Sequence, residues 1–149
     1  MLEKYKNDFF RDLTSFGGTY FFIFAIILFL LLNEIRIFKI LLIGLFLTYI
    51  ISFVIRIFYF KNRQNKEKYT NFIMKIDASS FPSVHSMRAI FMAIIISKFF
   101  ANPIMIIFLL LWALIVSYSR VYIKKHYWID IIVGLIIGIL LAFLLLRFI

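Results

Sequence analysis

Long apolar runs separated by short polar stretches dominate the chain. The runs cover approximately residues 16–32, 37–60, 87–101, 104–118 and 128–148. About 20 apolar residues are needed for a helix to cross the hydrocarbon of a bilayer, and helices satisfy their backbone polar groups internally. We therefore predict an all-α fold, a polytopic membrane helix bundle with about five transmembrane helices.

Two features refine this pattern at its polar boundaries. Asn102-Pro103 separates the third and fourth runs, each about 15 residues long, and predicts a tight turn that makes them a hairpin. Residues 1–16 mix charged and apolar side chains at roughly helical spacing. They favour an amphipathic helix lying on the membrane surface, with a solvated leader as the alternative.

Composition supports a single membrane domain. The chain has 149 residues, 64% of them hydrophobic, and a mean hydropathy of +1.02, whereas soluble domains are about half apolar. We see neither a linker nor an internal repeat, so residues 1–149 are expected to form one integral membrane domain. The formal charge of +10 then indicates a membrane surface and anionic lipid as partners, and no nucleic acid. The oligomeric state is left open, and the lack of cysteine excludes thiolate chemistry.

Alternating spans bring most of the polar side chains that can do chemistry to one face of the membrane. The second span ends there, the third begins, the fourth ends and the fifth begins. This face collects Arg56, Arg63, Ser83, His85, Arg88, Arg120, His126 and Asp130. Ionisable groups beside membrane spans are costly and usually functional. The N-terminus is expected on the same face and the C-terminus on the opposite one.

His126 and Asp130 lie four residues apart, on one face at the start of the fifth span. The carboxylate can accept the imidazole N–H, fix its tautomer and prepare the other nitrogen as a nucleophile. The alternative for Asp130 is an ion pair with Lys124 or Lys125 at the helix start.

The arginines and the Pro82–His85 segment suit a bound phosphate. Arg63 and Arg120 have planar guanidinium groups that match phosphate oxygens, and the alternative is snorkelling at the interface. Arg56 lies inside an apolar run and needs a partner or an anion. Ser83 and the helix start after Pro82 offer donors, and His85 could protonate a leaving oxygen. The alternative there is a capping serine and an interfacial histidine.

The charge on this face disfavours a metal ion, because three or more arginines repel a cation. No metal and no cofactor are therefore expected. The same arginines favour neutral His126, and they make an acid role for His85 dependent on a bound phosphate.

Three ordered motifs resemble those of the type 2 phosphatidic acid phosphatase (PAP2) superfamily. Ser119-Arg120, five residues, His126, three residues and Asp130 match the third signature. Pro82-Ser-Val-His85 is similar to the second signature, Pro-Ser-Gly-His. Arg56, followed after six residues by Arg63-Gln64, is similar to the first signature, which is a lysine followed after six residues by Arg-Pro. The resemblance covers residues 56 to the C-terminus, with the catalytic motifs in 56–130.

This resemblance implies a role for each matched position. His126 attacks phosphorus and becomes a phosphohistidine, Asp130 orients it, and His85 protonates the leaving lipid oxygen. The phosphate oxygens are held by Arg56, Arg63, Ser83 and Arg120. No metal is used.

The chain departs from the family pattern at three positions. Arg56 replaces a lysine, Gln64 a proline and Val84 a glycine. The chain is also expected to have five membrane spans, whereas membrane members of the family commonly have six. The β-branched Val84 crowds a phosphate approaching the backbone, and the lost proline makes the loop less rigid.

The resemblance implies a lipid phosphate monoester or diphosphate as substrate: lipid A 1-phosphate, undecaprenyl diphosphate, phosphatidylglycerophosphate or phosphatidic acid. Alternatives are a phosphotransferase with the same site and a non-catalytic protein that binds or transports anions. The excess of basic residues on the site face favours the cytoplasm. Analogy with the family instead places the site on the periplasmic face of the inner membrane, and this is the expectation we adopt.

Overall fold

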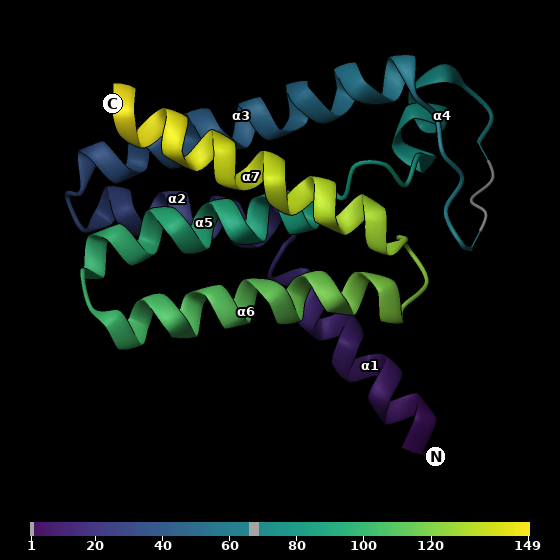
Figure 1. Cartoon of the computed structure of the whole chain (residues 1–149), viewed down its shortest axis with the longest axis horizontal. Helices are drawn as coiled ribbons and strands as arrows, with labels where there is room; N and C mark the ends of the chain where they lie inside the picture. The colour runs from purple at the N-terminus through teal and green to yellow at the C-terminus, as the bar shows by residue number, and fades with distance from the viewer. Residues whose placement is uncertain (1, 66–68) are drawn as a thin grey trace.

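The computed structural model describes residues 2–65 and 69–149, with only the backbone described for residues 2–4. Seven helices form in this part of the chain (Figure 1). They are α1 (Leu2–Ser15), α2 (Thr19–Leu31), α3 (Ile35–Phe58), α4 (Phe72–Ala78), α5 (Val84–Phe100), α6 (Pro103–Tyr122) and α7 (Trp128–Phe148). The prediction of an all-α membrane bundle is confirmed.

Helix α5 forms the centre of the bundle. It packs against α3, α6 and α7, and α2 packs against α3 (Figure 1). Its Phe91 is fully buried and stacks on Phe22 of α2 with ring centroids 6.0 Å apart. A Cβ on Gly44 of α3 would lie 2.2 Å from the Phe91 ring. The ring therefore occupies the space that a side chain at position 44 would need, and α3 can approach α5 closely.

Two glycines of α7 let that helix approach α5 closely as well. A Cβ on Gly134 would lie 2.5 Å from the carbonyl oxygen of Ser83, and one on Gly138 would lie 2.4 Å from that of Met87. Both obstacles are backbone atoms, which cannot rotate away as a flexible side chain can. The contact therefore fixes the start of α7 relative to the start of α5.

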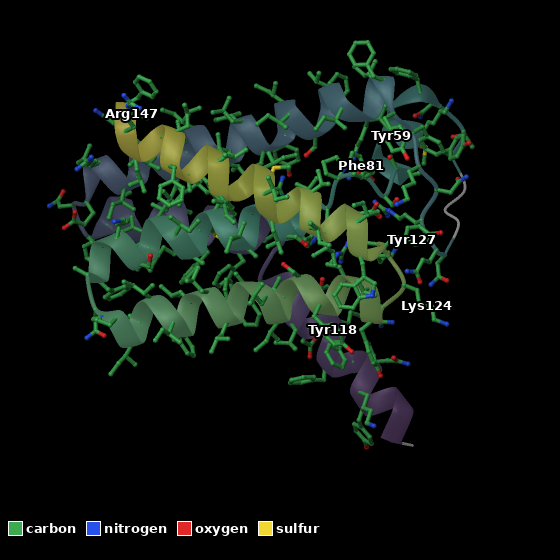
Figure 2. The ribbon with its side chains drawn as sticks, viewed as in Figure 1. Tyr59, Phe81, Tyr118, Lys124, Tyr127 and Arg147 are labelled. Carbon is green, nitrogen blue, oxygen red and sulfur yellow. The ribbon has the colours of Figure 1, made fainter. Side chains whose placement is uncertain are left out.

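Three helices of the described chain are long and apolar enough to cross a membrane, namely α3, α6 and α7. The consecutive helices α1 and α2, bent by 44° at their junction, would make a fourth span if they are counted together. The expected count of five is not confirmed, because α2 has 13 residues and α5 has 17. Helix α5 also carries Arg88 and Lys98. Many large apolar side chains of the bundle point outward, as lipid-facing surfaces do (Figure 2).

The polar ends of the helices meet as the alternation predicts. Helices α3 and α6 end, and α5 and α7 begin, at one end of the bundle, and the C-terminus lies at the other (Figure 1). Figure 2 shows Lys124 and Tyr127 at the first end and Arg147 at the second. The predicted hairpin between α5 and α6 is confirmed. Asn102 caps α6 by accepting from the amides of Ile104 and Met105.

Helix α1 extends away from the bundle at the same end as the polar loops (Figure 1). It contacts α6, and the ring of Phe10 stacks on Tyr122 with centroids 3.9 Å apart. The helix predicted for residues 1–16 is therefore formed over Leu2–Ser15, and its location on the membrane surface remains a prediction. Helix α4, which the sequence analysis did not predict, lies in the loop between α3 and α5 and is capped by Asn71.

Candidate active site

A cavity of about 300 Å³ opens at the polar end of the bundle. Five of the seven predicted site residues line it: Arg56, Arg63, His85, Arg120 and His126. They come from α3, the loop after it, α5, α6 and the loop before α7. The structure therefore brings together residues up to 70 positions apart, as the alternation of spans predicts. The other two predicted residues, Ser83 and Asp130, are buried but do not line the cavity.

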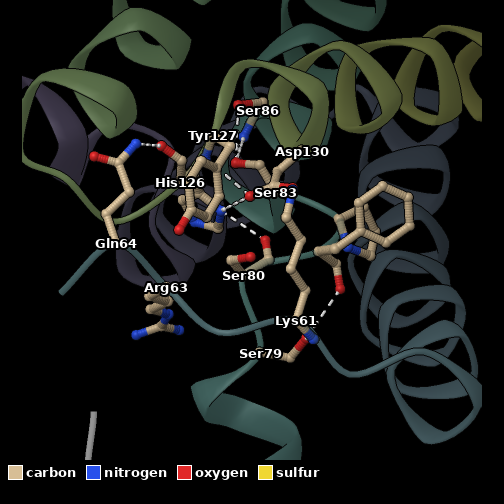
Figure 3. A network of polar contacts seen from close by, with 12 residues as sticks. Lys61, Arg63, Gln64, Ser79, Ser80, Ser83, Ser86, His126, Tyr127 and Asp130 are labelled. Carbon is tan, nitrogen blue, oxygen red and sulfur yellow. Dashed lines mark hydrogen bonds and ion pairs between the residues drawn. The ribbon is translucent and has the colours of Figure 1, made fainter. Parts of the chain in front are cut away.

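The ring of His126 is held by the backbone of Ser80. Nδ1 of His126 lies 2.7 Å from the carbonyl oxygen of Ser80, and both residues are buried (Figure 3). A carbonyl oxygen can only accept, so in the neutral ring Nδ1 carries the proton. Nε2 is then left unprotonated, with a lone pair available to attack an electrophile.

His126 is kept neutral by its surroundings. Burial first, and then the positive charges of Arg120 and Arg63, together lower the pKa of His126 from 6.5 to about 2. The hydrogen bond to Ser80 acts in the opposite sense and is outweighed. A histidine that is neutral at physiological pH has the protonation state that a nucleophile needs.

Asp130 does not make the hydrogen bond predicted for it. Its Oδ2 lies 3.9 Å from Nδ1 of His126, beyond hydrogen-bonding distance. Oδ2 instead accepts from the backbone N–H of Tyr127 at 2.9 Å, and Oδ1 pairs with Lys61 Nζ at 2.6 Å. The Nδ1 donor of the imidazole is taken by the carbonyl of Ser80 instead, and an orienting role of Asp130 toward His126 stays a prediction.

Lys61 is a site residue that the sequence analysis missed. Its ammonium group pairs with Asp130 and lies 4.4 Å from the centroid of the Tyr127 ring. Its backbone carbonyl accepts from the N–H of Ser80 at 2.8 Å, and its own N–H donates to Ser79 Oγ at 3.3 Å. One residue therefore neutralises Asp130 and also binds the backbone N–H of Ser80, the residue whose carbonyl holds His126 (Figure 3).

Ser83 has the capping role that the sequence analysis left as the alternative. Its Oγ accepts from the backbone N–H of Ser86 at 3.4 Å and lies 2.9 Å from Ser86 Oγ. Its N–H donates to the carbonyl of Asp130 at 2.9 Å, which links the start of α5 to the start of α7. The side chain fixes the entry of α5 rather than facing the cavity.

Arg56 is buried and organises the loop that precedes α5. Its guanidinium donates to the carbonyls of Phe81 at 3.3 Å, Ile76 at 3.4 Å and Pro82 at 3.2 Å. These bonds explain how an arginine is tolerated within an apolar helix, since buried charge requires hydrogen-bonding partners. Arg56 also lines the cavity, so it contributes positive charge there.

Arg63 and Arg120 approach the cavity from different segments. Nη2 of Arg63 donates to the carbonyl of Asp77 at 2.7 Å, and Nη1 of Arg120 donates to Thr14 Oγ1 of α1 at 2.9 Å. Helix α1 therefore contributes to the placement of Arg120. Both guanidinium groups also line the cavity and contribute positive charge there.

His85 lies in the first turn of α5 and faces the corner between α1 and α2. A Cβ on Gly17 would lie 3.0 Å from the carbonyl of His85, and one on Gly18 would lie 3.9 Å from its Nε2. The two glycines therefore allow this corner to approach the histidine.

The same motifs identify the family to which the chain belongs. A family model described as the PAP2 superfamily matches residues 54–149. The chain belongs to the PAP2 superfamily. The lipid A 4'-phosphatase of Bacteroides thetaiotaomicron is 40% identical over 58 residues, which are 39% of this chain and 26% of that protein. The match therefore spans about a quarter of that curated relative.

Two solved structures have a similar fold. The crystal structure of Aquifex aeolicus LpxE superposes with a TM-score of 0.79 and 22% identity, over 95% of this chain and 85% of that one. The crystal structure of a transmembrane PAP2 type phosphatidylglycerolphosphate phosphatase from Bacillus subtilis superposes with a TM-score of 0.62 and 24% identity, over 97% of this chain and 76% of that one. At these identities the likeness concerns the PAP2 fold alone.

The departures from the PAP2 signatures have visible consequences. Gln64, in place of proline, donates from Nε2 to the carbonyl of His126 at 2.8 Å, and the N–H of Asn65 donates to the carbonyl of Lys124 at 3.2 Å. These bonds tie the loop to the segment that carries His126 and replace the stiffness of a proline. Val84 starts α5 and lines the cavity, so its side chain faces the space available to a substrate.

Proposed function

We propose that this PAP2 protein is an integral membrane lipid phosphate phosphatase that acts through a phosphohistidine on His126. The observation that carries the proposal is the hydrogen bond from His126 Nδ1 to the Ser80 carbonyl. It leaves an unprotonated Nε2 in a cavity that also holds His85 and three predicted arginines. A nucleophile, a candidate acid and an anion clamp in one cavity are the parts that phosphoryl transfer needs.

The reaction we propose has two steps. Nε2 of His126 attacks phosphorus while the bond to the lipid oxygen breaks, and His85 donates a proton to that oxygen. Water then attacks the phosphohistidine, returns a proton to His85 and releases inorganic phosphate. Arg63 and Arg120 hold the phosphoryl oxygens as their charge shifts.

Metal independence is part of the proposal. The cavity is lined by four arginines and one carboxylate, that of Asp77. Such a field repels a divalent cation and attracts an anion. The arginines therefore supply the electrostatic stabilisation that a metal provides in other phosphatases.

We propose a lipid phosphate monoester or diphosphate as the substrate. The cavity is lined at one side by Phe53 and Tyr49, both about half exposed on the outer surface of α3. This gives an apolar exit toward the bilayer for the lipid chain. Lipid A 1-phosphate, undecaprenyl diphosphate, phosphatidylglycerophosphate and phosphatidic acid all carry this chemistry.

The deciding experiment measures phosphate release in detergent micelles from these four lipids, in EDTA. We expect release without added metal, inhibition by vanadate, and trapping of phosphate on the protein. Strict dependence on zinc or magnesium would contradict the mechanism. Appearance of a phosphorylated acceptor lipid instead of free phosphate would identify a transferase. Binding of lipid phosphate without turnover would identify a non-catalytic binder.

We propose the inner membrane as the location, with the site on the periplasmic face. The chain has no cysteine, so a single cysteine can report sidedness. Asn65 is exposed at the site end, and Arg147 lies at the opposite end. A membrane-impermeant maleimide applied to intact inner-membrane spheroplasts should label Asn65→Cys and spare Arg147→Cys. The reverse labelling would place the site in the cytoplasm.

A further inference from the structure

Arg88 is a buried cation to which the two proposed reaction steps assign no contact with the substrate. It lies on α5 one turn after His85 and is 2% exposed. Its Nη1 donates to Thr19 Oγ1 at 2.9 Å and its Nε to Thr48 Oγ1 at 3.3 Å. Its guanidinium lies 4.1 Å from the centroid of the Tyr49 ring. These three partners are all uncharged side chains.

The charge of Arg88 has no counterion in the described part of the chain. No Asp or Glu described there forms an ion pair with it, and Nη2 is buried without a hydrogen-bonding partner. Fully buried arginines are rare unless they are paired, because desolvation of a charge is costly. A buried guanidinium with an unused donor beside a cavity indicates that the partner is a ligand.

The cavity of His126 extends to Arg88. Arg88, Thr19 and Tyr49 line it together with the residues around the nucleophile. Tyr49 precedes Arg56 by seven residues on α3, a rise of about 10 Å along the helix. The cavity therefore reaches about two helical turns deeper into the bundle than Arg56. That length exceeds what one phosphate group bound at His126 requires.

The charge of the cavity also exceeds that of one phosphate. Its lining contains the guanidinium groups of Arg56, Arg63, Arg88 and Arg120 and one carboxylate, Asp77, which leaves a net charge of +3. A phosphate monoester carries roughly −1.5 to −2 at neutral pH. A second phosphate would neutralise the remainder.

We propose that Arg88, with Thr19 and Tyr49, forms a second anion subsite for a phosphate group that is linked to the reacting one. Resting on the proposed function, this assigns a lipid diphosphate as the substrate. The terminal phosphate lies at His126, the inner phosphate lies at Arg88, and the lipid chain leaves past Tyr49 and Phe53.

The chemistry balances for this substrate. Nε2 of His126 forms a bond to the terminal phosphorus, and the bond from that phosphorus to the bridging oxygen breaks. The bridging oxygen leaves as part of a lipid monophosphate and takes the proton of His85. Arg88 stabilises the negative charge on this leaving phosphate. Water then converts the phosphohistidine to inorganic phosphate.

Binding of small probes to the purified protein in detergent tests the subsite without turnover. Methylenediphosphonate carries two linked phosphoryl groups and cannot be hydrolysed at its P–C–P bridge, whereas methylphosphonate carries one. Titration calorimetry should show that Arg88→Gln weakens methylenediphosphonate binding by about 10- to 100-fold, the effect of losing a charged hydrogen bond. Binding of methylphosphonate should change far less. Arg147→Gln at the far end of the bundle is the matched control.

Two further measurements keep the test decisive. Arg88→Met removes the charge but keeps much of the volume. Its unliganded melting temperature should be equal to or higher than that of the wild type, while the stabilisation by methylenediphosphonate is lost. If Arg88→Met fails to fold, Arg88→Lys keeps the charge but lacks the planar guanidinium group. It should still weaken the binding of methylenediphosphonate selectively. Equal weakening of both probes, or of neither, would overturn the proposal.

Stoichiometry separates a linked phosphate from a free one. We expect the wild type to bind one methylenediphosphonate per chain. Two inorganic phosphates bound per chain with similar affinity would show a site for free phosphate and overturn the assignment of a diphosphate. Because binding requires no turnover, absence of phosphatase activity would contradict the proposed function and leave an Arg88-dependent binding result standing.

Discussion

Lys61 Nζ lies 2.6 Å from Asp130 Oδ1 and joins the loop after α3 to the first turn of α7. The carboxylate is fully buried, and the lysine side chain is 23% exposed. The backbone carbonyl of the same lysine accepts from the N–H of Ser80. The pair therefore connects the two segments between which the ring of His126 is fixed.

Removing the ammonium group should destabilise the protein. Lys61→Met leaves Asp130 as a buried charge without its partner, and we expect a loss of about 3 kcal/mol in the free energy of unfolding. The double variant Lys61→Met/Asp130→Asn should recover most of that loss, because no unpaired charge remains. Thermal unfolding in detergent measures both. Losses that simply add in the double variant would contradict the coupling.

His126→Ala should reduce phosphate release by at least about 10³-fold, because the covalent intermediate cannot form. The phosphorylated enzyme that we expect to trap by rapid acid-free quenching of the wild type should be absent in the same variant. Lys124→Ala, two residues away on the exposed loop, is the control and should retain activity. Full activity of His126→Ala would exclude the proposed nucleophile.

The pKa of His126 predicts how stability depends on pH. Burial and nearby arginines lower it from 6.5 to about 2, so the unfolded chain binds this proton more readily than the folded one. The stability that depends on neutral His126 is fully present above pH 6.5 and is lost progressively as the pH falls toward 2. Between pH 7 and 5 the loss should be about 2 kcal/mol. The free energy of unfolding of His126→Gln should fall correspondingly less over that range. Parallel curves of this free energy against pH for the variant and the wild type would contradict the lowered pKa of His126.

Gly134→Ala should separate α7 from α5. The added methyl group would lie 2.5 Å from the carbonyl oxygen of Ser83, so one helix must move. We expect a loss of about 1–3 kcal/mol in the free energy of unfolding and reduced phosphate release, since His126 precedes α7 directly. Ile136→Ala, on the exposed side of the same helix, is the matched control. Unchanged activity and stability of Gly134→Ala would show that the contact tolerates a side chain.

The sequence was sufficient to predict the bundle and the end of it that carries the site. Apolar runs mark the helices because lipid demands internally bonded backbone. Their alternation brings His85 and His126 to one end, and the structure places both on the same cavity. The hairpin turn at Asn102 was predictable because a capping side chain and a proline leave a local signature.

Other parts of the site depend on contacts that no local pattern encodes. Lys61 and Asp130 are 69 residues apart, and either could pair with other charges of the basic loops. Asp130 had the right spacing to reach His126, but Lys61 and the Tyr127 amide occupy its oxygens. Arg88 resembled an ordinary helix cation until its burial was known. Such roles are decided by packing between segments rather than by the residues themselves.

The acceptor that orients His126 is a peptide oxygen, that of Ser80. Every residue type has such an oxygen, so no single side-chain replacement at position 80 deletes it. Alanine scanning of this loop therefore cannot detect the group that sets the tautomer of the proposed nucleophile. Backbone chemistry is needed to detect it. An ester linkage between Ser80 and Phe81 would weaken the acceptor while leaving every side chain in place.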